Sequence, residues 1–149
     1  PPTGGETGKR NAILTAQFVL WNKQTELGEV FDSSTCFKLP NGSNRSPDVS
    51  WIQIDRWNAL TPREREKFPP IAPDFVLELM SPSDSLSETQ AKMREYMSAK
   101  VRLGCLIDRK NHRVEIYRLG QEVEILDSPA TLSGEDVLPG FALDMRFVW

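Results

Sequence analysis

Asp74 and Glu78 are two acidic residues inside an apolar stretch, an arrangement typical of metal ligands and of structural ion pairs. Both belong to the run 73–80, whose apolar residues and flanking prolines are typical of a buried strand. An ionised carboxylate left unpaired in such a strand destabilises the fold by on the order of several kcal/mol. Either an Arg or Lys partner or a divalent metal could supply the missing positive charge, and this strand alone favours neither.

These two acids are predicted to share one face of the strand, because side chains alternate between the two faces of an extended chain. Asp74 and Glu78 point to the same side as Val76 and Met80. The opposite face takes the apolar residues Phe75, Leu77 and Leu79.

Asp48 is a third acidic candidate, at the start of a strand predicted over 48–54. By the same alternation it shares a face with Ser50 and Ile52. The dipeptide Pro47-Asp48 is also typical of a turn, since an Asp side chain readily bonds the backbone near it. Sequence alone leaves both interpretations open.

Lys92 lies on a helix predicted to begin with the capping box of Ser85 and Glu88 and to end near Lys100. Tyr96 and Glu88 each lie one turn away from this lysine. Helical periodicity alone favours an exposed pair between Lys92 and Glu88.

Glu6 stands just ahead of another predicted helix, 7–27, in which apolar residues recur at helical spacing. A carboxylate stabilises a helix N-terminus, and this cap role is the simpler interpretation of Glu6. Gly28 follows the helix and is expected to be its C-cap.

The remaining elements place these candidates in an αβββαβ order. Strands 30–39 and 48–54 are predicted to form a hairpin around the Asn41-Gly42 turn. A short helix follows, with Thr61 as N-cap and a proline at its first position. The last elements are strands over 103–108, 114–119 and 123–126 and an apolar tail, 132–149, that is expected to pack back on the sheet. This order brings Asp48 and Glu78 onto neighbouring strands.

The length of 149 residues predicts a single domain over 1–149, with 39% hydrophobic residues and no apolar run long enough to cross a membrane. No secretory signal is visible, so a cytoplasmic location is expected. Cys36 and Cys105 are expected to be reduced thiols, and His112 an exposed residue without a catalytic role. The net charge of −3 means that a polyanion must be met by local basic groups, among them Arg63, Arg65 and Lys67.

Two carboxylates that converge beside a lysine are what metal-dependent phosphodiester hydrolysis needs. The carboxylates supply hard oxygen ligands for Mg²⁺ or Mn²⁺, and the lysine places a cation near the attacking water or the phosphate. The spacing of these residues does not by itself settle the function.

Five segments of the chain resemble the successive motifs of the Uma2 family (DUF820), which is common in cyanobacteria. These segments are Ser46–Trp51, Pro73–Asp84, Lys92–Tyr96, Leu106–Asp108 and Val114–Tyr117, and the resemblance covers nearly the whole chain. The family is assigned to the PD-(D/E)xK nuclease superfamily. The resemblance therefore implies a restriction-endonuclease-like α/β fold, with a mixed central sheet flanked by helices, and metal-dependent endonuclease activity on DNA.

The resemblance also implies a role for each candidate residue. Asp48 would be the acid of the PD motif and Glu78 the acid of the (D/E)xK motif, and both would then be ligands of Mg²⁺ or Mn²⁺. Asp74, which shares a face with Glu78, is our candidate for a third ligand. The motif lysine would fall at Met80, so Lys92 would have to supply the cation from the following helix. Glu6 would match an acidic residue that such nucleases often carry on their first helix.

Two further functions are compatible with these residues. One is a catalytically silent nuclease fold that binds nucleic acid or a protein partner, which the missing motif lysine and the acidic net charge favour. The other is a glycosidase that uses Asp48 and Glu78 as its two carboxylates, with Trp51 or Trp57 as a sugar platform. A homodimer is one assembly that the sequence allows.

Overall fold

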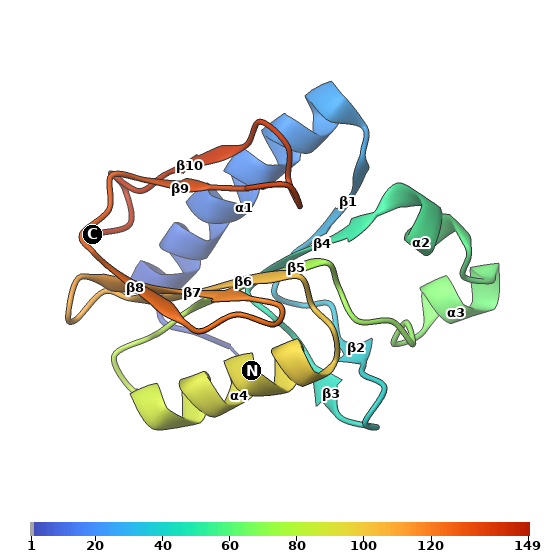
Figure 1. The fold of residues 1–149 in the computed structure, drawn as a ribbon, viewed down its shortest axis with the longest axis horizontal. Helices are drawn as coiled ribbons and strands as arrows, with labels where there is room; N and C mark the ends of the chain where they lie inside the picture. The colour runs from blue at the N-terminus through green and yellow to red at the C-terminus, as the bar shows by residue number, and fades with distance from the viewer. Residues whose placement is uncertain (1) are drawn as a thin grey trace.

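A six-stranded mixed sheet forms the centre of the chain in the computed structural model, which describes residues 2–149 (Figure 1). The strand order is β1-β4-β5-β6-β7-β8, in which β5 and β6 are parallel and the other neighbours antiparallel. The bounds of these strands are Gly28–Phe31 (β1), Val49–Gln53 (β4), Phe75–Leu79 (β5), Leu103–Asp108 (β6), Arg113–Arg118 (β7) and Glu124–Asp127 (β8).

Two helices cover opposite faces of this sheet, α1 (Gly5–Thr25) on one and α4 (Leu86–Ser98) on the other (Figure 1). On the α1 face, Leu14 and Phe18 pack among inward residues of β4 and β5, including Leu77. On the α4 face, Met93 and Tyr96 pack on the alternate residues of the same strands. The predicted αβββαβ core and the alternation along the central strand are both confirmed, with α1, β1, β4, β5, α4 and β6 as the core elements.

The register between β4 and β5 brings two of the candidate acids together. Val49 pairs with Leu77 and Ser50 with Val76. One step further along this antiparallel register, Asp48 stands opposite Glu78, and directly opposed residues share a face. The prediction that Asp48 and Glu78 come from neighbouring strands is confirmed.

The predicted hairpin of strands 30–39 and 48–54 is only partly correct. The chain turns at Asp32, where the Thr35 N–H donates to the Asp32 carbonyl, and this turn ends β1 early. The Asn41-Gly42 turn instead closes a separate hairpin of β2 (Phe37–Lys38) and β3 (Asn44–Arg45). Strand β1 pairs directly with β4, and the β2-β3 hairpin lies between these two strands in the sequence.

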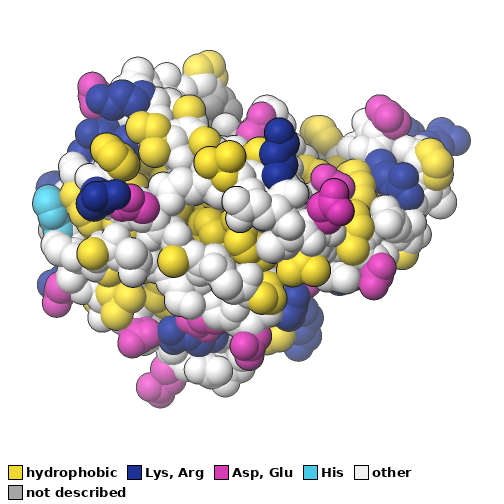
Figure 2. Space-filling model, turned by 90° about the horizontal axis from the view of Figure 1, so that it is seen from above, with side chains coloured by type: hydrophobic (Ala, Val, Ile, Leu, Met, Phe, Trp, Pro, Cys, Tyr) yellow, Lys and Arg dark blue, Asp and Glu magenta, His cyan; other side chains and the backbone are white. Residues whose placement is uncertain are grey.

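A helical excursion between β4 and β5 projects from the molecule, at the right of Figure 2. It contains α2 (Ile54–Asn58), which sequence did not predict and which the Gln53 side chain caps. The second helix, α3 (Pro62–Glu66), has the predicted Thr61 cap, completed into a capping box by Glu64.

The C-terminal tail packs against both α1 and the sheet. Two short strands, β9 (Thr131–Ser133) and β10 (Ala142–Asp144), form an antiparallel pair beside α1 (Figure 1). The Trp21 indole N–H donates to the Pro139 carbonyl at 2.9 Å. No helix within residues 2–149 has the length and apolar character needed to cross a membrane.

Helix α1 ends without the predicted glycine cap. Glu26 takes the left-handed conformation there, with φ of 54°, and its N–H donates to the Asn22 carbonyl. Gly28 is needed for a different reason, because a Cβ at this position would overlap the Ile52 carbonyl oxygen and the Trp51 indole ring. Glycine therefore lets β1 lie close against β4.

We expect Gly28→Ala to lower the free energy of unfolding by about 3 kcal/mol or more, because a backbone carbonyl and a buried ring cannot move aside cheaply. Urea denaturation measures this. Gly5→Ala is the matched control, since a Cβ at Gly5 meets nothing within 4 Å and alanine favours a helix. Equal stability of the two variants would contradict the role given to Gly28.

Candidate active site

A cavity of about 780 Å³ opens beside the C-terminal end of β5. Its walls come from the start of α1, the segment before β4, the turn that follows β5, and α4. The ionisable side chains that line it are Glu6, Asp48, Glu78, Asp84 and Lys92. All four residues expected to be catalytic line this cavity, and each comes from a different part of the chain.

The Asp48 carboxylate is held in place by hydrogen bonds on both oxygens. The Leu79 N–H donates to Oδ2 at 2.7 Å, and the Asn11 side-chain amide donates to Oδ1 at 3.4 Å. Burial raises the pKa of Asp48, and the Leu79 bond and the nearby Lys92 charge oppose that rise. The carboxylate is fixed in orientation and remains only partly buried.

The Glu78 carboxylate is buried, with 5% of the residue exposed, and each oxygen meets a different partner. The Tyr96 hydroxyl donates to Oε2 at 2.8 Å, and the Lys92 ammonium lies 3.7 Å from Oε1. Burial, followed by repulsion from the Asp48 charge, raises the pKa of Glu78 to about 7. Two carboxylates and one ammonium therefore meet at the wall of the cavity, and only Glu78 among them is buried.

Lys92 faces this carboxylate pair from α4. The lysine side chain is 35% exposed, and its ion pair is with Glu78 rather than with Glu88. The Lys92 ammonium lies 3.7 Å from the Glu78 carboxylate, within the reach expected of a lysine that takes the place of the motif lysine. Met80 also lines the cavity and brings no charge to it. The catalytic role of Lys92 remains a prediction.

Glu6 stands at the rim of the cavity in the first turn of α1. Its side chain is 74% exposed and pairs with Lys9 at 3.1 Å and Arg10 at 2.9 Å. Hydrogen bonds from these two residues lower the pKa of Glu6. The side chain is close to the cavity, but its carboxylate already has two cationic partners.

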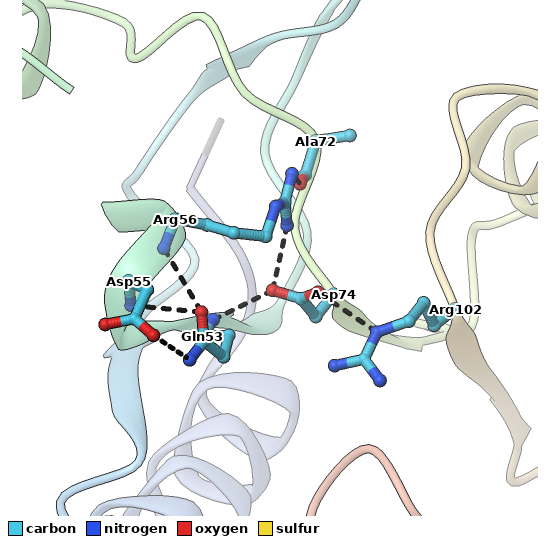
Figure 3. A network of polar contacts seen from close by, with 6 residues as sticks. All are labelled: Gln53, Asp55, Arg56, Ala72, Asp74 and Arg102. Atoms are coloured by element: carbon cyan, nitrogen blue, oxygen red, sulfur yellow. Dashed lines mark hydrogen bonds and ion pairs between the residues drawn. The ribbon is translucent and has the colours of Figure 1, made fainter. Parts of the chain in front are cut away.

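Asp74 is not brought to the cavity, which corrects its expected role as a third metal ligand. It precedes β5, four residues and about 13 Å of extended chain from Glu78. Arg56 donates to one carboxylate oxygen at 2.8 Å and Arg102 to the other at 3.1 Å (Figure 3). The Gln53 N–H also donates to the first oxygen, so Asp74 joins α2 to the sheet.

Two residues around the site were not singled out from the sequence. Tyr96 is fully buried and holds one oxygen of Glu78, and its spacing of one turn from Lys92 is the signal that could have identified it. Asn11 is a buried polar residue on α1 that contacts Asp48. Its position depends on how α1 docks on the sheet, and no local pattern predicts that.

The donor set fits a divalent metal that takes part of its ligands from water and substrate. No cluster of three or more His, Cys, Asp or Glu residues suited to a metal occurs in the part of the chain that the structure describes. Mg²⁺ is commonly held by one or two carboxylates, waters and substrate phosphates, which Asp48 and Glu78 match. The buried Asn11 Oδ1 finds no hydrogen-bond donor within residues 2–149, so it could accept from such a water.

Comparison with known proteins identifies the family and a similar solved structure. The family model Uma2, described as "Putative restriction endonuclease", matches residues 1–146. The chain is also similar to the crystal structure of "a putative nuclease belonging to DUF820 from Anabaena variabilis ATCC 29413", with a TM-score of 0.80 and 22% identity. That similarity covers 99% of this chain and 82% of the other, and it establishes the fold. The search of curated proteins found no match.

The raised pKa of Glu78 predicts a specific pH dependence of stability. The folded chain keeps a proton up to about pH 7 that a carboxyl of ordinary pKa 4.5 loses earlier. We therefore expect the free energy of unfolding to fall by about 3 kcal/mol as the pH rises from about 4.5 to above 7. Glu78→Gln should abolish this fall. Urea denaturation across that interval measures it, and parallel curves for parent and variant would contradict it.

Asp74 is expected to stabilise the fold in its ionised form, unlike Glu78. We expect Asp74→Asn to lower the free energy of unfolding at neutral pH by about 2 kcal/mol, because two arginines lose a buried partner. Asp144→Asn is the matched control, since the Asp144 pair with Arg146 lies at the surface, where water screens it, and should contribute much less to stability. The same urea titration compares them, and equal effects would mean that the Asp74 network is no stronger than a surface pair.

Proposed function

The chain belongs to the Uma2 family, and from this membership and the geometry of the cavity we propose that it is an endonuclease that hydrolyses DNA phosphodiester bonds with Mg²⁺ or Mn²⁺. One observation carries the proposal. Asp48, Glu78 and Lys92, from three separate elements, converge on a single cavity in which the ammonium lies 3.7 Å from a buried carboxylate.

In this proposal the two carboxylates hold the metal and α4 supplies the cation. When bound, the metal polarises the phosphate and lowers the pKa of a bound water. The Leu79 N–H and Asn11 keep the Asp48 oxygens in fixed positions. Tyr96 holds Glu78 Oε2 and leaves Oε1 directed toward Lys92 and the cavity.

Lys92 would orient the scissile phosphate or the attacking water. A point charge on a flexible side chain suits this task, because the phosphate oxygens move apart from the leaving group during the reaction. The Lys92 charge also opposes the rise that burial causes in the pKa of both carboxylates, which favours the ionised forms that bind a metal. Ionisation of Glu78 around pH 7 leads us to expect activity that increases from acidic to mildly alkaline pH.

The test separates metal binding from cleavage. We expect Mn²⁺ at millimolar concentration to raise the melting temperature of the parent, since a ligand that binds only the folded state stabilises it. Lys92→Ala should keep this rise but cleave plasmid DNA at least about 100-fold more slowly, as expected when a charge that stabilises the transition state is lost. Glu78→Gln should lose both the rise and the cleavage.

Arg94→Ala is the matched control on the same helix, because Arg94 is exposed and lies outside the cavity lining. It should cleave as fast as the parent. Cleavage by Lys92→Ala at the parental rate would refute the role of this lysine. A parent that binds Mn²⁺ and nucleic acid but never cleaves would support the silent fold instead, and sugar hydrolysis that persists in EDTA would support a glycosidase.

A further inference from the structure

A shallow groove lies on the outer side of the β2-β3 hairpin. Its lining residues are Lys38, Gly42, Asn44, Lys67 and Phe68. The hairpin supplies the first three, and the segment between α3 and β5 supplies the other two. A backbone hydrogen bond of 3.0 Å from the Lys38 N–H to the Pro69 carbonyl joins these two parts.

The hairpin turns its polar side chains into this groove. Lys38 pairs directly with Asn44, so both project to the same side. Phe37 projects to the opposite side and is fully buried in the core on the α4 face. Arg45 is drawn to α4, where it pairs with Glu95 at 2.6 Å. The outer face of β2-β3 thus carries one lysine and one amide that the fold does not use.

The other wall adds a second lysine and an exposed aromatic ring. Phe68 is 57% exposed and lies outside both hydrophobic clusters of the described residues. Within residues 2–149, neither Lys38 nor Lys67 forms an ion pair. Two free ammonium groups beside one exposed ring match a ligand that alternates negative charges with flat apolar rings.

Single-stranded nucleic acid has this chemistry. Its phosphates pair with lysines and its unpaired bases stack on aromatic side chains. A duplex would offer phosphates to Lys38 and Lys67 but no open base for Phe68. An acidic peptide would engage the two lysines and leave the ring without a partner.

The groove and the cavity are lined by nearby residues of one stretch of chain. Ser46 lines the cavity, and Asn44, two residues earlier in the chain, lines the groove. Two residues of extended chain span about 7 Å. One short segment of chain, residues 44–46, therefore contributes to both the cavity and the groove.

We propose that the groove formed by Lys38, Asn44, Lys67 and Phe68 binds a single strand of nucleic acid beside the site of cleavage. Phe68 stacks on one base, the two lysines contact phosphates, and Asn44 bonds to the base or the backbone. This inference rests on the proposed function, since it assumes that the neighbouring cavity holds the same strand.

The test measures binding of the full chain to fluorescein-labelled oligo-dT and to a duplex of the same length by fluorescence anisotropy. EDTA is present, so binding is observed without metal or cleavage. We expect Phe68→Leu to weaken oligo-dT binding about tenfold, as loss of one stacked base implies, and Phe68→Trp to restore it. Lys38→Gln with Lys67→Gln should lower the slope of log affinity against log salt by about 1.4.

Matched controls carry the same substitutions elsewhere. Phe147 is 63% exposed, and Phe147→Leu should bind oligo-dT as the parent does. Lys23→Gln with Lys100→Gln makes the same charge change outside the groove and should leave the salt dependence unchanged. Melting temperatures within a few degrees of the parent show that each variant is folded.

Three results would overturn the inference. These are unchanged oligo-dT binding in the Phe68 and lysine variants, tighter binding to the duplex with the same sensitivity, or displacement of oligo-dT by polyglutamate with no effect of Phe68→Leu. Cleavage by the parent that Asp48→Asn abolishes would then leave the proposed function standing without the groove. Groove-dependent binding by a parent that never cleaves would support the groove and reject the nuclease.

Discussion

The buried Glu78 carboxylate is the group on which the arrangement of this site depends. A carboxylate at 5% exposure in a strand of the central sheet has to be compensated, and the compensation comes from another element. Helix α4 provides it through Lys92 and Tyr96, which occupy different oxygens of the same carboxylate. The charge of Glu78 is thus compensated only where α4 packs against β5, so the site depends on the contact between this helix and this strand.

Asp74 shows that the same requirement can be met without producing a site. It shares a face with Glu78 and is equally buried, yet two arginines and a backbone N–H satisfy both of its oxygens (Figure 3). Glu78 has one lysine at 3.7 Å, and burial together with the nearby Asp48 charge still raises its pKa. A buried carboxylate whose charge is only partly balanced by its partners is a candidate metal ligand, whereas one with both oxygens fully paired is a structural acid.

Local sequence patterns predicted the parts of the fold that local physics determines. Period-two alternation assigned the faces of β5 correctly, and the Thr61 and Ser85 caps marked the starts of α3 and α4. The partners of Asp74 could not be predicted, because Arg56 and Arg102 lie 18 and 28 residues away in sequence. The predicted strand 30–39 is too long, because a turn at Asp32 ends β1 although the residues on both sides of the turn are typical of a strand.

The lysine position illustrates how tertiary packing replaces a motif. A lysine at position 80 would reach the Glu78 carboxylate by strand alternation alone, whereas Lys92 reaches it only if α4 packs closely on the sheet. Gly104 of β6 permits that approach, since a Cβ there would lie 2.7 Å from Met93 Cε and 3.3 Å from Val76 Cγ2. Because Met93 directly follows Lys92, the distance between ammonium and carboxylate depends on core packing under α4. The geometry of this site is therefore a property of the helix-sheet interface, and a scan for a lysine two residues after the acid does not detect it.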